Sequence, residues 1–213
     1  MNHARVGKIV IPTSVSTIGE GAFAGATITS LNIPNSVRSA GYYICEECRQ
    51  LKTVTFGNGL TTIPYRMFYN CASLTSVSMG NNIKKLDGLV FGYCSSLKQI
   101  KIPDSVTSLG DGCFGECSAL TTINFPKNLN EIGYQTFFNC KSLTSVTFSN
   151  TLQTIGGLAF YGTKIKKVRI PVSVTYVGTQ AFPAEAVIEG LNGLQKIENG
   201  SYMRMEKLPI KVT

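Results

Sequence analysis

Apolar residues recur along this chain at fixed positions of a unit of 22 or 23 residues. They occupy the first, fourth, sixth, tenth and thirteenth positions of each unit, whereas polar residues prevail at the third and fifth. An aromatic residue follows at the eighteenth position, with Cys45 as the only departure. Such repetition predicts a stack of similar modules rather than a globule with one closed core. The units begin at Val6, Ile28, Leu51, Leu74, Leu97, Leu120, Leu143 and Ile165.

The spacing within a unit predicts a short strand followed by corners. Positions three to six alternate between polar and apolar residues, which is the pattern of a half-buried strand. Proline is common at position seven, where its missing N–H suits a strand end, and glycine at position fourteen indicates a corner. A short extended segment lies between these corners. The segment up to the aromatic residue is too short for a long helix and predicts a helical or 3₁₀ turn. No unit can bury its apolar face alone, so the units must stack.

Positions one, four and six together give L-x-x-L-x-L, the signature of a leucine-rich repeat. Residues 97–117 (LKQIKIPDSVTSLGDGCFGEC) and 143–160 (LTSVTFSNTLQTIGGLAF) closely resemble the BspA-like, or treponemal-type, leucine-rich repeat. The resemblance covers roughly residues 6–186. We therefore expect an α/β-type repeat fold, a curved right-handed solenoid with parallel strands on its concave face and short extended or 3₁₀ segments elsewhere. The resemblance also implies a cell-surface or extracellular protein used for adhesion and protein recognition.

The repeat pattern predicts one array of eight units over residues 1–186. Two units, residues 6–27 and 143–164, are one residue shorter, and both lack the column cysteine. Residues 187–213 are interpreted as a degenerate ninth repeat that forms a cap, or as the point where a longer protein is truncated, since a solenoid needs a cap at its open end. No apolar run is long enough to span a bilayer, and the first residues contain no recognisable signal peptide.

Five of the seven cysteines form a column with a spacing of 23 residues. Each of the other two lies close in sequence to a column cysteine, which gives the pairs Cys45/Cys48 and Cys113/Cys117. Such pairs are typical of zinc sites or disulfides, but zinc would need further ligands and the only histidine is His3. Stacking would place column cysteines about 5 Å apart, with parallel side chains that do not favour disulfides. We expect buried free thiols and no metal or cofactor, although export would favour oxidation. The column cysteines are Cys48, Cys71, Cys94, Cys117 and Cys140.

Catalytic chemistry has little support in the sequence. With a single, terminal histidine, neither a Ser-His-Asp nor a Cys-His arrangement can be assembled. The carboxylates show no recurrent spacing suited to acid/base work, and a glycine-rich phosphate loop is absent. We predict that the chain is not an enzyme.

The polar positions three and five of the predicted strands form the candidate ligand-binding face. The net charge of +8 allows an anionic ligand, and the densest basic run, residues 164–169, places two cations on this face. Middle units carry mainly Ser, Thr and Asn there, which are also simple solubilising residues of a solvated strand face. The candidate ligand-binding residues are Gln99, Lys101, Thr122, Asn124, Ser145, Thr147, Lys167 and Arg169.

Three functions are compatible with this pattern. The leading hypothesis is a non-enzymatic scaffold that binds a protein or glycan through its strand-lined face. The alternatives are a structural spacer or stalk that displays other domains, and a weak polyanion binder whose affinity would fall steeply with salt. Nucleic acid is disfavoured as a ligand because no aromatic stacking platform accompanies the charges. The sequence identifies neither the ligand nor the oligomeric state.

Overall fold

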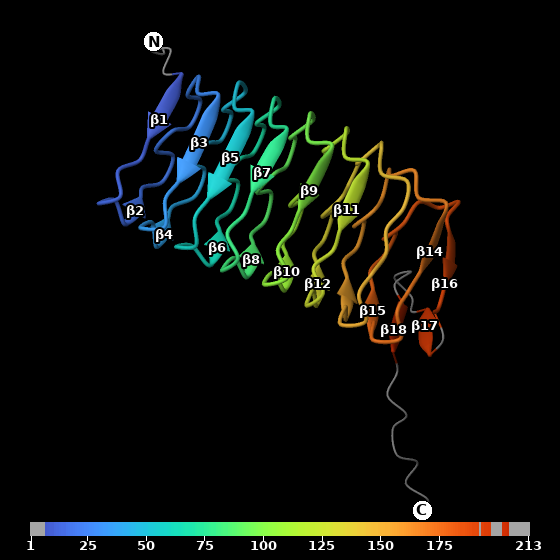
Figure 1. The fold of residues 1–213 in the computed structure, drawn as a ribbon. Helices are drawn as coiled ribbons and strands as arrows, with labels where there is room; N and C mark the ends of the chain where they lie inside the picture. The colour runs from blue at the N-terminus through green and yellow to red at the C-terminus, as the bar shows by residue number, and fades with distance from the viewer. Residues whose placement is uncertain (1–6, 192, 197–201, 205–213) are drawn as a thin grey trace, which may run out of the picture.

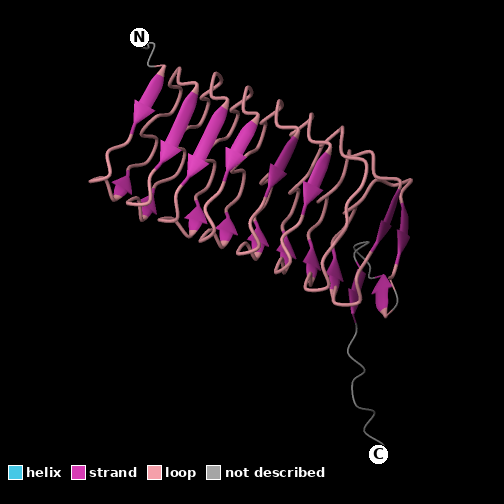
Figure 2. Ribbon diagram, in the orientation of Figure 1, coloured by secondary structure: helices cyan, strands magenta, loops and turns pink. Residues whose placement is uncertain are grey.

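The computed structural model describes residues 7–191, 193–196 and 202–204, and these form an elongated stack of about eight turns (Figure 1). Each complete turn has up to two short strands, one in each of two rows that run along the stack (Figure 1). The described residues contain strands, turns and loops but no helix (Figure 2). The parallel-strand leucine-rich-repeat solenoid is thus confirmed, whereas the α/β label and the 3₁₀ segments are not. The curvature and handedness of the coil stay predictions.

The first row contains the strands predicted from the alternating pattern. Equivalent residues of successive units face each other in parallel, so that Val54 lies opposite both Leu31 and Val77. The hydrogen-bonded order is β1-β3-β5-β7, followed by the separate pairs β9-β11 and β14-β16. The strands are β1 (Lys8–Val10), β3 (Ser30–Ile33), β5 (Thr53–Phe56), β7 (Ser76–Ser78), β9 (Gln99–Lys101), β11 (Thr122–Asn124), β14 (Lys167–Arg169) and β16 (Val187–Glu189).

The second row forms at the segments where the sequence predicts only a short extended connection. From β6 to β15 its strands pair in parallel without interruption, and β2 pairs with β4. The chain direction then reverses, because β18 pairs antiparallel with β15 and with β17. Residues 205–213 of the predicted tail lie outside the described residues. The strands are β2 (Thr17–Ile18), β4 (Ser39–Ala40), β6 (Thr62–Ile63), β8 (Lys85–Leu86), β10 (Ser108–Leu109), β12 (Glu131–Ile132), β13 (Thr154–Ile155), β15 (Tyr176–Val177), β17 (Leu194–Lys196) and β18 (Tyr202–Arg204).

Turn segments, rather than helical turns, return the chain from each second-row strand to the next unit. Fifteen residues at positions sixteen and twenty have φ between +52° and +73°, and only four of them are glycine. Residues with left-handed backbone conformation at these two positions, four residues apart, prevent a continuous right-handed helical turn. The N–H of Phe68 donates to the carbonyl of Val90 at 2.9 Å, one unit further on. Hydrogen bonds between units therefore hold this third side of the coil together.

The aromatic column forms the centre of the core. Six phenylalanine rings stack face to face, with neighbouring centroids 5.1–5.6 Å apart. Five of these rings are fully buried, and Phe182 at the end of the column is 5% exposed. Their stacking fixes the spacing of successive units, as the predicted column requires. The rings belong to Phe68, Phe91, Phe114, Phe137, Phe160 and Phe182.

Candidate ligand-binding face

The first-row strands place their polar side chains on the outer surface of the array. Within each strand the apolar residues point inward, so Val54 and Phe56 are only 2% and 5% exposed. All eight residues predicted to bind a ligand are exposed. Six of them lie on the first-row strands β9, β11 and β14, which orient their side chains outward, but orientation alone does not make a binding site.

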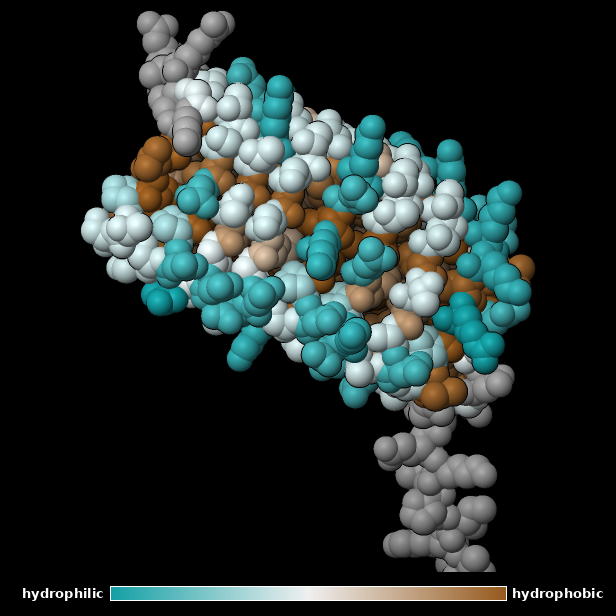
Figure 3. Space-filling view, in the orientation of Figure 1, coloured by the Kyte–Doolittle hydropathy of each residue, from teal (hydrophilic) through white to brown (hydrophobic). Residues whose placement is uncertain are grey.

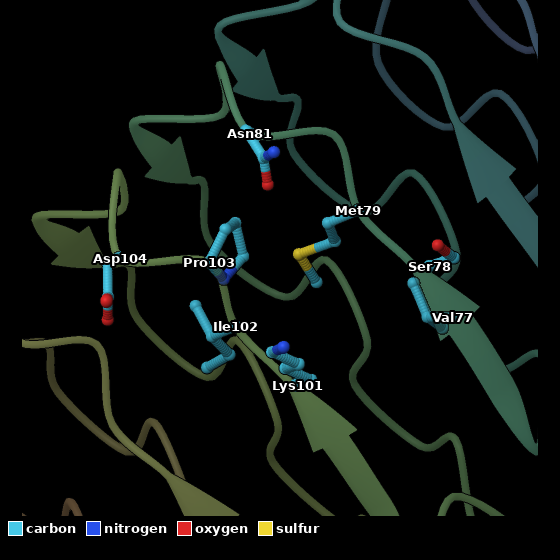
Figure 4. A pocket seen from close by; sticks show the side chains of 8 residues that line it. All are labelled: Val77, Ser78, Met79, Asn81, Lys101, Ile102, Pro103 and Asp104. Atoms are coloured by element: carbon cyan, nitrogen blue, oxygen red, sulfur yellow. The ribbon is translucent and has the colours of Figure 1, made fainter.

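A break in the first sheet creates a groove on this face. No ladder joins β7 to β9 among the described strands, and we call this gap the seam. Half-buried Val77 and Met79 lie beside it, whereas the equivalent residues one unit earlier are buried. A groove of about 570 Å³ opens here, with Met79 projecting between the end of β7 and the next unit (Figure 4). Its lining comprises Val77, Ser78, Met79, Asn81, Lys101, Ile102, Pro103 and Asp104.

Two further grooves continue from the seam along the same face. The first, about 460 Å³, is lined by Gln99, Lys101, Thr122 and Asn124 together with half-buried Phe125. The second, about 270 Å³, shares Thr122 and Asn124 and adds Ser145 and Thr147. Figure 3 shows apolar surface between the polar side chains of this face. Six of the eight predicted residues thus line adjoining grooves with an apolar floor and a polar rim.

Lys167 and Arg169 lie apart from these grooves, on β14. The seventh unit, between β11 and β14, contributes no strand to the first sheet among the described residues. The Nζ atom of Lys167 is 2.8 Å from Oε1 of Glu189 on β16. Both side chains are largely exposed, so this ion pair adds little stability, but it reduces the positive charge that the sequence suggests at this end of the array.

Met79, Ile102 and Asp104 line the seam but were not among the predicted site residues. Met79 and Ile102 occupy an apolar column, which the alternating pattern assigns to the core. One signal is present in the sequence, since Met79 is the single methionine in a column that otherwise contains isoleucine and phenylalanine. Methionine is flexible and adapts to irregular surfaces, which suits a position where the sheet is interrupted.

All seven cysteines are buried and free. The thiol of Cys94 donates to the carbonyl of Phe68 at 3.3 Å, and that of Cys117 to the carbonyl of Phe91 at 3.1 Å. Burial raises the pKa of Cys94 and that of Cys140 to about 12, which keeps both thiols protonated and unreactive. The cysteine column thus contributes a row of weak hydrogen bonds between successive units. Within the described part of the chain, no group of three or more His, Cys, Asp or Glu side chains is placed to hold a metal ion.

Cys48 differs from the other column cysteines. A hydrogen bond with the Cys45 thiol, aided by backbone N–H groups of Ala26 and Gly25, lowers the pKa of Cys48 despite its burial. The same interaction, together with burial, raises the pKa of Cys45. Cys45 occupies the repeat position of the aromatic ring in its unit, so Cys48 has a thiol neighbour where the other column cysteines have a phenylalanine.

A model of the BspA-type leucine-rich repeat region matches six copies, over residues 1–120 and 65–189. The chain belongs to the BspA-type leucine-rich repeat family. Its repeats therefore belong to a known class of scaffold, as the L-x-x-L-x-L spacing and the phenylalanine column indicate. A search of curated proteins found no match. No helix in the described residues has the length and apolar character required to cross a membrane.

Solved structures of bacterial leucine-rich repeat proteins share the fold. A leucine-rich cell surface protein of Faecalibacterium prausnitzii is 29% identical, with a TM-score of 0.65 over 89% of this chain and 46% of its own. A Bacteroides ovatus protein is 26% identical, with a TM-score of 0.60 over 83% of this chain and 55% of its own. The leucine-rich repeat protein of T. pallidum, at 19% identity and a TM-score of 0.56, covers 82% of this chain and 67% of its own. The BspA-type array thus spans about half the length of the first two proteins.

Proposed function

We propose that this chain is a non-enzymatic recognition scaffold of a cell-surface or secreted protein, which binds a protein or glycan through its strand-lined face. The observation that carries the proposal is the run of grooves from the seam to the seventh unit. There, exposed polar side chains surround half-buried apolar ones such as Met79 and Phe125. An apolar centre within a polar rim is the usual composition of a protein interface.

The regular placement of side chains on strands supports the same function. Side chains held on strands are positioned more accurately than side chains on loops, and the stack presents them at a regular spacing. Its repeat family supports a scaffold rather than a catalyst. The likeness to a cell surface protein of Faecalibacterium prausnitzii supports placement at the cell surface.

A pair of matched substitutions tests the face. Asn124→Arg introduces a long cation into the grooves, whereas Thr55→Arg makes an equivalent change at the same repeat position of β5, outside the groove linings. Both side chains are exposed, so both variants should fold. The purified arrays are compared for binding to a glycan array and to immobilised extracellular-matrix proteins. We expect Asn124→Arg to lose ligands that Thr55→Arg retains. Retention of every ligand by both variants would refute a role for the grooves.

The alternatives make different predictions. A spacer is favoured by the greater length of the similar solved proteins, of which this chain covers 46% and 55%, and it predicts no saturable ligand for the isolated array. A polyanion binder predicts an affinity for heparin that falls steeply with salt and is weakened by Lys167→Glu and Arg169→Glu. Unchanged affinity in these two variants would exclude the basic pair as the anionic site.

A further inference from the structure

The turn segments carry a set of exposed tyrosines that the strand-face site does not use. Among the described residues, the large apolar or aromatic side chains with the greatest exposure are four tyrosines and three valines. All four tyrosines lie in turn segments and are 41–51% exposed. We call this surface the tyrosine edge. Its exposed members are Tyr42, Tyr93, Tyr134 and Tyr161.

Further tyrosines with half-buried rings support this edge. The Tyr65 ring packs against Gly88, where an added Cβ would lie 3.3 Å from Cδ2 of the ring. Tyr42 and Tyr65 contact edge to face, with centroids 6.4 Å apart, and Tyr69 and Tyr93 do the same at 5.3 Å. Tyrosines held in this way offer a large contact area at a low cost in conformational entropy.

A groove of about 550 Å³ lies on this edge between Tyr65 and Gln135. Gly88 lies between Tyr65 and Asp111 in this row of the repeat and allows their close approach, since an added Cβ would lie 3.3 Å from the Tyr65 ring and 3.1 Å from the Asp111 carbonyl oxygen. The groove is lined by three carboxylates, Asp87, Asp111 and Glu131, and by one cation, Lys85, whose Nζ is 2.9 Å from Oδ1 of Asp87. Its titratable lining groups other than tyrosine thus have a net charge of −2, although the chain as a whole carries +8.

The same imbalance extends along the turn segments. Positions fourteen to twenty of the eight units contain six acidic residues and a single basic one, Arg66. Arg66 forms an ion pair with Glu46, and its guanidinium lies 4.0 Å from the centroid of the Tyr69 ring. This surface therefore already holds one guanidinium between a carboxylate and a tyrosine. The six acidic residues are Glu20, Glu46, Glu47, Asp87, Asp111 and Glu116.

We propose that the tyrosine edge is a second interaction surface, which binds a protein partner through exposed arginine or lysine side chains of that partner. A cation entering the groove would meet the Tyr65 ring and the carboxylates of Asp111 and Glu131. Ring and carboxylate recognise a guanidinium by cation–π attraction and charge-assisted hydrogen bonds, and charge complementarity selects the sign of the partner. The proposal does not depend on the strand-face function, because none of its residues lines the seam or the two grooves beside it.

A labelled nona-arginine peptide tests this surface in a fluorescence anisotropy titration, with the uncharged nona-citrulline peptide as its comparison. Attraction of a cationic peptide to a chain of +8 requires a local negative surface. We expect the arginine peptide to bind at least roughly ten-fold more tightly than the citrulline peptide, with an affinity that falls as salt screens the charges. Equal binding of the two peptides, or no binding of the arginine peptide, would overturn the proposal.

Two matched variants locate the binding on the edge. Asp111→Asn removes a charge from the groove but keeps the oxygen that accepts the N–H of Tyr134 at 2.8 Å. Asp104→Asn removes the same charge at the seam and keeps the equivalent oxygen, which accepts the N–H of Lys127 at 3.1 Å. We expect Asp111→Asn to weaken nona-arginine binding by roughly five-fold and Asp104→Asn to leave it nearly unchanged. Equal effects would place the binding elsewhere.

A third variant separates the aromatic contribution from the charge. Tyr65→Leu keeps an apolar side chain beside Gly88 but removes the ring, and we expect nona-arginine binding to fall by about three-fold. Circular dichroism and thermal unfolding check that each variant folds. If Asp111→Asn does not fold, Glu131→Gln takes its place, because Glu131 is exposed and its carboxylate accepts a long, 3.3 Å hydrogen bond from the Ser108 hydroxyl. Unaltered nona-arginine binding in both Glu131→Gln and Tyr65→Leu would refute the assignment of the binding site to the tyrosine edge.

Discussion

Replacing Phe114 by alanine tests the stacked phenylalanine column on which the array depends. The Phe114 ring is fully buried between Phe91 and Phe137, with centroids 5.4 and 5.3 Å away. Truncation removes the ring from the middle of the stack and leaves a cavity on both sides. Because each repeat contacts only its neighbours, the loss falls on two unit interfaces that no other part of the chain can reinforce.

The free energy of unfolding should fall by about 3–5 kcal/mol, the usual cost of truncating a buried phenylalanine to alanine. For a chain of this length, the midpoint of thermal unfolding should fall by roughly 6–20 °C, at about 2–4 °C per kcal/mol. Urea denaturation followed by far-UV circular dichroism measures the loss. Circular dichroism suits this chain because it reports on the strands and needs no tryptophan, of which the sequence has none.

Phe125→Ala provides the matched control. Its ring contacts Phe137 and Phe148, with centroids 5.7 and 5.5 Å away, but it is only half-buried beside the strand-face groove. We expect a loss of about 1–2 kcal/mol, since part of this ring already faces water. A loss below about 1 kcal/mol for Phe114→Ala, or equal losses in the two variants, would refute the argument that the column holds the units together.

Two further predictions concern backbone packing and thiol burial. Gly59→Ala should destabilise the array by about 1–3 kcal/mol in urea denaturation, because the added Cβ would lie 1.9 Å from the Val37 carbonyl oxygen. Gly19→Ala, whose Cβ would have nothing within 4 Å, should change stability by less than about 0.5 kcal/mol. Equal effects of the two substitutions would contradict this account of the packing. Burial raises the pKa of Cys94 and Cys140 from 9.0 to about 12, so the unfolded chain loses these protons first and stability should fall as pH rises from 9.0 to about 12. Within this range each thiol adds about 1.4 kcal/mol per pH unit to the fall in the free energy of unfolding. Cys94→Ala should therefore make this fall shallower, and an unchanged slope would show that burial does not raise the pKa of Cys94.

The first-row strands and the phenylalanine column could be predicted because their signals are local. Alternation of side chains along residues such as Val54, Thr55 and Phe56 assigns one face to the core without knowledge of any other unit. The second sheet gives no such signal, because its parallel strands contain only two residues each. Those strands exist because stacking aligns equivalent segments of neighbouring units.

The helical or 3₁₀ form predicted for the turn segments is not confirmed, for a similar reason. Leu89 and Tyr93 adopt φ values of +56° and +61°, which residues of these types seldom do alone. Hydrogen bonds between units stabilise this conformation: the Leu89 N–H donates to the Asp111 carbonyl at 2.8 Å, and the Tyr93 N–H donates to the Gly115 carbonyl at 2.8 Å. The local sequence therefore suggests a helical turn, while the stack selects a different one.

The candidate site was only partly predictable. Position in the repeat exposes Gln99, Lys101, Thr122 and Asn124, but the seam arises from strands that do not pair, which no single unit encodes. Likewise, the contact of Lys167 with Glu189 joins residues 22 positions apart and appears only once β14 and β16 lie side by side.

The seam also has a mechanical consequence. Backbone hydrogen bonds resist the separation of neighbouring strands, and the first sheet has no such ladder between β7 and β9, whereas the second sheet continues unbroken past this level through β8 and β10. At this level the array is thus hydrogen-bonded along its second sheet and has no strand pairing along its first, which favours bending here. A ligand that contacts both β7 and β9 would set the angle between the two halves of the rod, so that binding could be measured as a change in the distance between its ends.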